Sequence, residues 1–177
     1  MGLLSIIRAQ KLKDRELRVL VLGLDNAGKT TVVKYLLNDP LATLPTMGFA
    51  IDTLTREDST IHFWDVGGQK SLRPFWGNYF EHTDVVVWVV DAASVERVQE
   101  LAQELNELRD TKRLVGVRVV VVVNKVDLLP PQQRAEVVPR VEALFGDDVT
   151  TVVASAKTGE NLDRVLEAIL EDHYNMI

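Results

Sequence analysis

The sequence predicts an α/β domain in which helices cover both faces of a six-stranded, mostly parallel sheet. Three observations support this prediction. Strand-like and helix-like segments alternate along the chain, which is typical of doubly wound domains. Two uninterrupted valine-rich runs, Val85–Asp91 and Val117–Asn124, are typical of strands buried on both faces. A polar turn between two alternating segments adds one antiparallel pair.

The first half of the chain contains the glycine loop and the hairpin. Leu17–Gly23 predicts a strand that runs into a glycine-rich loop, and Gly28–Leu37 predicts a helix that ends before Pro40. Ala50–Arg56 and Thr60–Asp65 alternate between apolar and polar residues, with a polar turn between them. They predict a β-hairpin, which is the antiparallel part of the sheet.

The second half continues the alternation around the two valine-rich strands. Val95–Arg109 has apolar residues at helical spacing. Pro131–Phe145 and Gly159–Tyr174 predict two further helices, and Val149–Ala154 predicts the last strand. The whole pattern implies six strands and about five helices, in one domain over residues 16–177.

Composition restricts the class of protein. The 177 residues suit one domain, and 46% of them are hydrophobic, which is enough for a sizeable core. The net charge of -6 argues against non-specific nucleic-acid binding. The sequence has no cysteine, which excludes disulfides, zinc–thiolate sites and cysteine nucleophiles. A reducing, intracellular compartment fits this composition, so we expect a cytoplasmic protein.

The segment GLDNAGKT, residues 23–30, joins the first predicted strand to the first predicted helix. The spacing G-x-x-x-x-G-K-T in that context is typical of a phosphate-binding loop. Gly23 and Gly28 allow backbone N–H groups to converge on phosphate oxygens, and the helix adds its positive N-terminal end. We expect Lys29 to reach the β- and γ-phosphates and the Thr30 hydroxyl to bind Mg²⁺.

A second motif, WDVGGQ, follows the hairpin at residues 64–69. Asp65 stands where an acidic residue holds magnesium in phosphate-loop proteins, directly or through water. The Gly68 N–H is the expected donor to the γ-phosphate, and Gln69 is placed to orient an attacking water.

A third motif, NKVD, follows the second valine-rich strand at residues 124–127. The Asp127 carboxylate can accept from both N1–H and N2–H₂ of guanine, and adenine offers neither donor there, so this residue favours GTP over ATP. Lys125 can pack its stem along the base, whereas we expect Asn124 to tie the strand end to the phosphate loop. The SAK segment, residues 155–157, adds backbone donors for the guanine O6.

The motifs GLDNAGKT, PTMGF, WDVGGQ, NYFEHTD and NKVD together resemble those of the Ras-like small GTPases, and within them the ADP-ribosylation-factor (Arf) and Arf-like branch. The resemblance covers nearly the whole chain, and the second and third Arf-like proteins look most similar. It implies the phosphate-loop NTPase fold of a small G domain, GTP or GDP with Mg²⁺ as ligands, and a molecular switch with slow GTP hydrolysis.

The resemblance also implies roles for four residues outside these loops. Thr46 matches the switch threonine that closes on Mg²⁺ and the γ-phosphate. Phe49, Trp64 and Tyr79 match the aromatic trio that binds effectors in the GTP state. From the residues alone, all three could equally be core aromatics. The segment Ala50–Trp64 matches the hairpin that slides when the nucleotide changes.

The predicted site residues are therefore as follows. Gln69 is the catalytic residue; Thr30, Thr46 and Asp65 are the metal ligands; and the nucleotide-binding residues are Gly23, Leu24, Asp25, Asn26, Ala27, Gly28, Lys29, Thr30, Thr31, Thr46, Gly68, Asn124, Lys125, Asp127, Ser155, Ala156 and Lys157.

Partners follow from the resemblance. We expect GTP-state effectors, either carriers of prenylated or myristoylated cargo or a tubulin-folding cofactor, together with an exchange factor and a GTPase-activating protein. We expect a monomer that binds no nucleic acid. Arg73 is expected to contact a partner. Asp25 is expected to face outward, where it could pair with a partner's arginine. The sequence shows no obvious arginine of its own that would accelerate GTP hydrolysis, so we expect a partner to supply one.

Residues 1–15 predict a short amphipathic helix, with apolar residues first and basic residues after them. It can be buried in the protein or contact a partner or membrane weakly; a frayed surface terminus is the alternative. Ile6 stands where the myristoylation signal requires Ser or Thr, so we expect no myristate on Gly2. We expect a cytoplasmic protein that can also associate with the cytoskeleton or with a membrane.

Two rival functions remain open from the residues. One is a phosphate-loop enzyme that acts on ATP or another phosphate acceptor. The other is a GTP-loaded binding module without significant turnover, against which the intact Gln69 argues.

Overall fold

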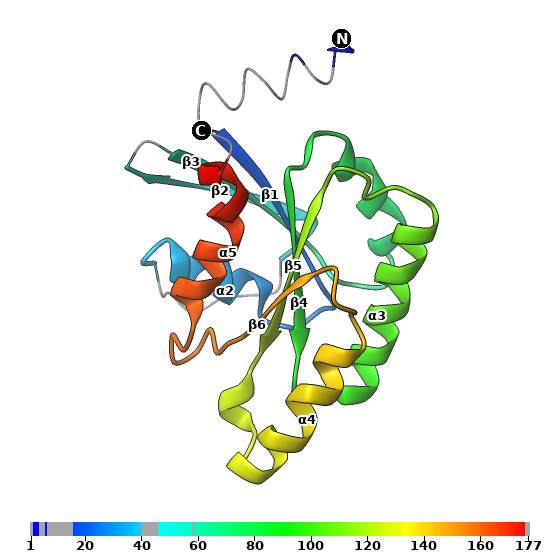
Figure 1. Cartoon of the computed structure of the whole chain (residues 1–177), viewed down its shortest axis with the longest axis vertical. Helices are drawn as coiled ribbons and strands as arrows, with labels where there is room; N and C mark the ends of the chain where they lie inside the picture. The colour runs from blue at the N-terminus through cyan, green and yellow to red at the C-terminus, as the bar shows by residue number, and fades with distance from the viewer. Residues whose placement is uncertain (1, 4–5, 7–15, 40–45, 58, 176–177) are drawn as a thin grey trace.

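The computed structural model describes residues 2–3, 6, 16–39, 46–57 and 59–175, with side chains through residue 171. Its six strands form one sheet in the order β2-β3-β1-β4-β5-β6 (Figure 1). The strands are β1 (Glu16–Leu22), β2 (Phe49–Arg56), β3 (Ser59–Val66), β4 (Val85–Asp91), β5 (Arg118–Asn124) and β6 (Thr150–Val153). The described helices are α2 (Lys29–Leu36), α3 (Val95–Asp110), α4 (Pro131–Ala143) and α5 (Leu162–Asn175), with 3₁₀ segments η1 (Arg73–His82) and η2 (Val126–Leu128).

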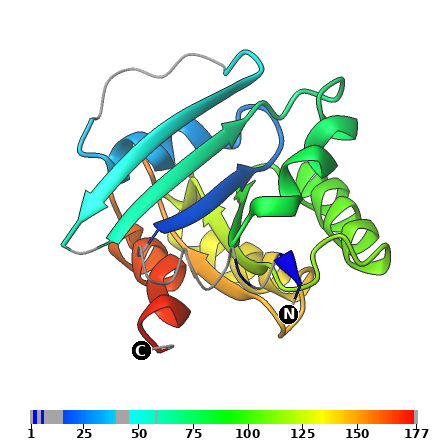
Figure 2. The same ribbon diagram turned by 90° about the horizontal axis from the view of Figure 1, so that it is seen from above.

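The pairing of the strands confirms the predicted fold class. Strands β2 and β3 are antiparallel, with Phe49 opposite Val66, and Figure 2 shows this pair at one edge of the sheet. All other neighbouring pairs are parallel. The carboxyl ends of the five parallel strands therefore meet at one end of the sheet, where ligands bind in open α/β domains.

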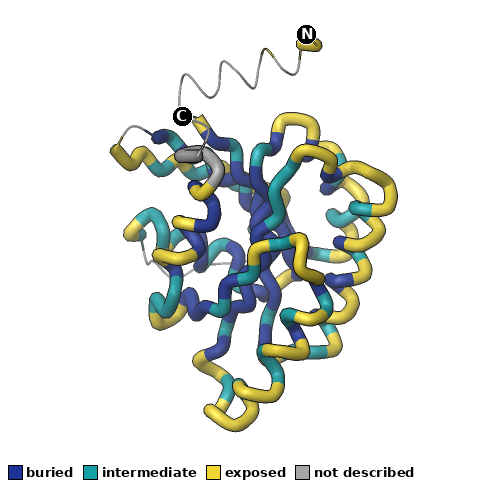
Figure 3. Tube along the Cα trace, viewed as in Figure 1, coloured by how far each residue is buried: buried dark blue, intermediate teal, exposed yellow. Residues whose placement is uncertain are grey.

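Helices cover both faces of the sheet, with α2 and α5 on one side and α3 and α4 on the other (Figure 1). In β4, Val85, Val87 and Val89 pack towards α2 and α5, whereas Val86 and Trp88 pack towards α3 and η1. This two-sided burial explains why the central strands are continuous apolar runs, and they are buried along their length in Figure 3.

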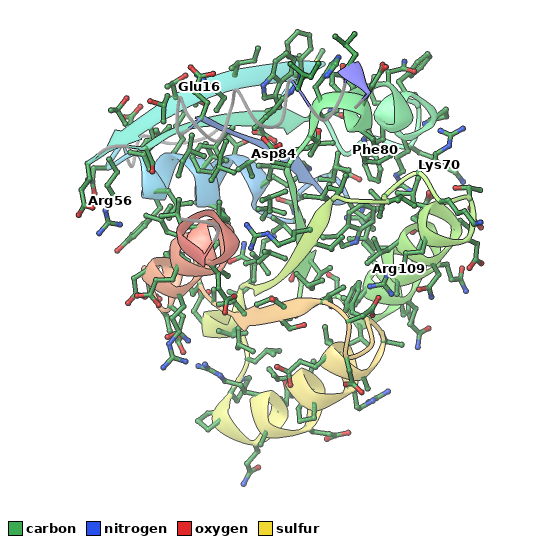
Figure 4. The ribbon with its side chains drawn as sticks, turned by 45° about the horizontal axis from the view of Figure 1, so that its top comes forward. Glu16, Arg56, Lys70, Phe80, Asp84 and Arg109 are labelled. Carbon is green, nitrogen blue, oxygen red and sulfur yellow. The ribbon has the colours of Figure 1, made fainter. Side chains whose placement is uncertain are left out.

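The segment η1 is an element that the periodicity of the sequence did not reveal. Its side chains Trp76 and Phe80 are buried against the sheet, and Trp76 meets Trp88 edge-on with ring centroids 5.6 Å apart. The backbone N–H of Arg18 donates to Asp84 Oδ2 at 2.8 Å, which joins β1 to the start of β4. Asp84 is labelled in Figure 4.

The predicted helix over residues 1–15 lies almost entirely outside the described residues, so the boundary between it and the domain stays a prediction. Within the part of the chain that is described, no helix has the length and apolar character needed to span a bilayer.

Candidate functional site

The phosphate loop connects β1 to α2, and its backbone requires glycine at both ends. A Cβ on Gly23 would lie 2.3 Å from the Val89 carbonyl oxygen, and Gly28 has a φ of 96°. A Cβ on Gly28 would also lie 2.3 Å from Asn124 Nδ2. The loop is thus packed against the neighbouring strands β4 and β5, which leave no room for a side chain at either glycine.

The loop encloses a cavity of about 320 Å³ between the N-terminus of α2 and the segment after β3. Lys29 lies beside it with only 6% of its surface exposed, and its Nζ donates to the Leu24 carbonyl at 3.0 Å. Burial lowers the pKa of Lys29, and the nearby Asp65 and Asp25 carboxylates oppose this effect. The cavity is lined by Asp25, Asn26, Gly28, Lys29, Thr30, Thr31, Thr46, Gly67, Gly68 and Gln69.

The three predicted metal ligands lie together, with Thr30 and Thr46 lining the cavity and Asp65 in contact with both. The Thr30 hydroxyl lies 2.5 Å from Asp65 Oδ2 and 2.7 Å from the Thr46 hydroxyl, and Thr46 also lies 3.2 Å from Asp65 Oδ2. Asp65 is 1% exposed, and burial raises the pKa of its carboxyl although Thr30 and Lys29 oppose the shift.

This cluster fits a magnesium ion. It consists of hard oxygen donors, which Mg²⁺ prefers alongside phosphate oxygens and water. Asp65 Oδ1 is buried and has no hydrogen-bond partner among the described residues, so the protein leaves one carboxylate oxygen available for a ligand. The assignment of Thr30, Thr46 and Asp65 as ligands stays a prediction that this geometry supports.

The predicted catalytic side chain, Gln69, lies on the same cavity. Its Nε2 donates to the Thr46 carbonyl at 3.4 Å, while its Oε1 is buried without a hydrogen-bond partner in the described part of the chain. The glycine before it packs directly on the phosphate loop, because a Cβ on Gly68 would lie 2.3 Å from the Gly23 carbonyl oxygen. The position of Gln69 supports the predicted role in orienting water.

The base-binding loops are joined to the phosphate loop by side chains. Asn124 Nδ2 donates to the Ala27 carbonyl and Asn124 Oδ1 accepts from the Ala156 N–H, each at 2.9 Å, which is the predicted tie. The Ser155 hydroxyl donates to Asp127 Oδ1 at 2.7 Å. Lys125 donates to Asp91 Oδ2 at 3.0 Å and to the Asn26 carbonyl.

These contacts bring the sequence-predicted residues into one continuous site. Lys157 is exposed at its rim, whereas Ser155 is fully buried. The bridge between Arg134 of α4 and Glu160 supports the same loop, and the Ser155 N–H donates to the Glu160 carbonyl at 3.1 Å. Sequence reasoning did not find this support, because α4 and the loop are adjacent only in space.

Two arginines make contacts that the sequence did not reveal. Arg97, in the first turn of α3, pairs with Asp25: its Nη2 lies 2.5 Å from Asp25 Oδ1. The chain therefore has its own arginine at the phosphate loop. Arg73 was predicted to contact a partner, but its side chain is only 8% exposed and binds Glu100 Oε1 at 2.5 Å and the Gly68 carbonyl at 3.3 Å. The signal that could have found Arg97 is its place just after a parallel strand.

The three predicted effector aromatics lie together, with Phe49 on β2, Trp64 on β3 and Tyr79 on η1. The Phe49 and Trp64 rings stack with centroids 5.9 Å apart, and Tyr79 lies 6.2 and 6.3 Å from them. Phe49 is 50% exposed and the other two rings are partly exposed, so the alternative that all three are core residues is wrong.

Comparisons with known proteins agree with this site and fold. The model of the ADP-ribosylation factor family matches residues 3–173. The chain is 45% identical over 178 residues to "ADP-ribosylation factor-like protein 2" of Drosophila melanogaster, covering 97% of this chain and 95% of that protein. It is 41% identical over 174 residues to "ADP-ribosylation factor-like protein 3" of Chlamydomonas reinhardtii, covering 97% and 98%.

A solved structure shares the fold. It is the Arl6 BBS3 small GTPase from Trypanosoma brucei with a bound nucleotide analogue, at a TM-score of 0.76 and 24% identity over 90% of this chain and 98% of that one. The chain belongs to the ADP-ribosylation factor family and is an Arf-like small GTPase, a switch that binds GTP or GDP with Mg²⁺ and hydrolyses GTP.

Proposed function

We propose that the GTP-bound form of this switch binds its effectors through the aromatic face formed by Phe49, Ile51, Trp64 and Tyr79. The observation that carries the proposal is the connection of this face to the nucleotide site. Strand β2 begins at Phe49, three residues after Thr46, and Trp64 immediately precedes Asp65 in β3. A change at the γ-phosphate and metal site is therefore transmitted directly to the face.

The backbone strengthens this connection. The Gly67 N–H donates to the Gly48 carbonyl at 2.7 Å, and Trp76 Nε1 donates to the Gly67 carbonyl at 3.3 Å. These bonds link the segment before β2 to the segment after β3, which lie on either side of the cavity. A rearrangement of one segment cannot leave the other unchanged, because each backbone group would lose its partner.

The aromatic face has the character of a binding surface. Ile51 lies opposite Trp64 in the hairpin and is 48% exposed, beside the half-exposed Phe49. The Arg18 guanidinium carbon lies 3.8 Å from the Trp64 ring centroid, so a cation borders the apolar patch. Clustered, partly exposed aromatics with a polar border are typical of interaction hot spots.

For hydrolysis, we propose that Gln69 orients the attacking water with its unpaired Oε1, while Lys29 and backbone N–H groups hold the phosphates. Bound Mg²⁺ would neutralise phosphate charge, held by Thr30, Thr46 and Asp65. The intrinsic rate is slow in this proposal, and an activating protein raises it.

We further propose that the effector is a carrier of lipid-modified cargo, which the GTP-bound switch induces to release that cargo. The supporting observation is the similarity to relatives named Arf-like proteins 2 and 3, the subgroup whose motifs the chain resembles. The proposed location is cytoplasmic, with transient membrane contact during cargo delivery.

The test uses a purified prenyl-binding carrier loaded with a fluorescent farnesylated peptide. The chain loaded with a non-hydrolysable GTP analogue should lower the peptide's anisotropy, and the GDP-loaded chain should not. Phe49→Ala should abolish release while nucleotide binding is retained. Val115→Ala is the matched control, because Val115 is 72% exposed and lies in the loop after α3.

Absence of release in both nucleotide states would contradict the cargo proposal. Nucleotide-dependent binding to a purified tubulin-folding cofactor, measured in parallel, would then identify the other effector class. Release that is equal for Phe49→Ala and the wild type would contradict the role of the aromatic face.

A further inference from the structure

The first turn of α3 contacts the phosphate loop through a single arginine. Arg97 Nη2 lies 2.5 Å from Asp25 Oδ1, and Arg97 Nη1 donates to the Asp25 backbone carbonyl at 3.0 Å. The guanidinium therefore holds both the side chain and the backbone of one loop residue. The two residues are 72 positions apart, so the fold, not the local sequence, makes this contact.

The position of Arg97 is fixed by the end of β4. The backbone N–H groups of Arg97 and Val98 donate to the Ser94 carbonyl at 3.0 and 3.1 Å, which starts the helix. Val98, one residue later, is 2% exposed and anchors the turn in the core. The Ala93 N–H donates to Asp91 Oδ1 at 2.9 Å, so the turn before the helix is held as well.

The pair lies where charge affects phosphate binding. Asp25 lines the cavity together with Lys29 and Thr30, so its negative charge lies close to the expected polyphosphate. An unpaired carboxylate there would repel the ligand.

Arg73, the other nearby arginine, does not supply this charge to Asp25 by direct contact. Its Nη1 lies 2.5 Å from Glu100 Oε1 and 3.8 Å from Glu104 Oε1, so acids of α3 already pair with it. The side chains of the Arg97–Asp25 pair are 41% and 50% exposed.

We propose that Arg97 is a positioning residue that neutralises Asp25 and thereby sets the preference of the pocket for GTP relative to GDP. GTP carries one phosphoryl group more than GDP, and we place the added negative charge of this γ-phosphate near Asp25. Loss of the arginine leaves the carboxylate uncompensated, and this penalises GTP more than GDP. This inference concerns the nucleotide pocket and is independent of the effector proposed above.

The test measures the dissociation constants of fluorescent GDP and of a fluorescent non-hydrolysable GTP analogue, in the presence of Mg²⁺. Arg97→Ala should lower the affinity for the analogue relative to GDP by about three- to fivefold, the range expected for a partly exposed ion pair. The loss should shrink at high salt because the interaction is screened. Arg97→Lys, which retains the charge, should recover most of the ratio.

The double variant Asp25→Ala/Arg97→Ala separates charge compensation from a structural role. With both charges removed, the affinity ratio should return close to that of the wild type. A ratio as low as in Arg97→Ala alone would overturn the proposal, and so would an unchanged ratio in Arg97→Ala.

The matched control is Arg140→Ala, which removes an equally charged residue from an exposed pair with Glu136 on α4. It should leave the ratio unchanged, and an equal loss there would attribute the effect to net charge and overturn the proposal. Release of the farnesylated peptide from the carrier by the analogue-loaded wild type is a separate readout, so failure of one proposal does not depend on the other.

Discussion

The two ends of the nucleotide site differ in how completely the protein satisfies its own polar groups. At the base end, Asn124 makes hydrogen bonds with both its amide nitrogen and its amide oxygen, and Ser155 binds Asp127. At the phosphate end, Asp65 Oδ1 and Gln69 Oε1 are buried without a partner among the described residues. Buried polar atoms are rarely left unpaired, and these two lie where the γ-phosphate, Mg²⁺ and attacking water are expected to bind.

This difference suggests a division of labour. The base end is held rigid by bonds between strand ends, and it is suited to recognise a base that is common to GTP and GDP. The phosphate end is completed by the group in which the two nucleotides differ. The switch therefore acts through Thr46, Asp65 and Gln69. These residues are close in sequence to Phe49 and Trp64 of the aromatic face.

The largest expected effect is on chemistry at the phosphate end. Gln69→Leu removes the buried amide oxygen, so single-turnover GTP hydrolysis should fall by roughly 10²-fold or more. GDP affinity should stay within about twofold, because the base end is untouched. Gln132→Leu, at an exposed position on α4, is the control and should hydrolyse GTP at the wild-type rate. Full hydrolysis by Gln69→Leu would remove the catalytic assignment.

The base end should respond in the opposite way. Asp127→Asn replaces an acceptor of two guanine N–H bonds by an amide, and the affinity for GDP and for a GTP analogue should fall together by about 100-fold. Competition titrations against labelled GDP give both constants. A loss confined to the GTP analogue would contradict the division between the two ends.

A smaller effect is expected from crowding the phosphate end. A Cβ on Gly68 would lie 2.3 Å from the Gly23 carbonyl oxygen and 2.4 Å from the Asp25 N–H nitrogen, so Gly68→Ala should displace the segment after β3. The GTP analogue should bind about tenfold more weakly while GDP binding changes little. Gly2→Ala is the matched control, because a Cβ there meets nothing within 4 Å. Equal losses for both nucleotides would show that Gly68 supports the whole site.

The smallest effect concerns one carboxyl group. Burial beside the cavity raises the pKa of Asp25, but the hydrogen bond and charge of Arg97 and the charge of Arg73 outweigh it, and the pKa lies below its ordinary value. A depressed carboxyl pKa stabilises the fold above the unfolded-state pKa, and this contribution is lost as the pH falls through the folded-state value. Arg97→Ala should raise the pKa of Asp25 in an NMR titration, and an unchanged pKa would show that the pair is not formed in solution.

Much of this organisation could be predicted from the sequence, because it depends on local patterns. The strands, the phosphate loop and the NKVD segment follow from periodicity and spacing, and the parallel order brings their ends together. The contacts of Arg97, Arg73 and Arg134 could not be predicted in this way. They join segments that are distant in sequence, and a long charged side chain has no periodicity that reveals its partner.

The segment η1 illustrates a second limit of sequence reasoning. Its apolar residues are four positions apart, but Pro74 and Gly77 interrupt the stretch, so its pattern gave no clear helix. Burial of Trp76 and Phe80 against the sheet stabilises it instead. Tertiary packing outweighed local propensity there.

The most direct test of the division between the two ends is amide hydrogen exchange in the GDP-bound and GTP-analogue-bound protein with Mg²⁺. Residues 46–51 and 64–69 should become more protected with the GTP analogue, while residues 124–127 and 155–157 should exchange equally in both states. Equal exchange throughout, or a change concentrated in the base-binding loops, would contradict a switch that operates through the phosphate end.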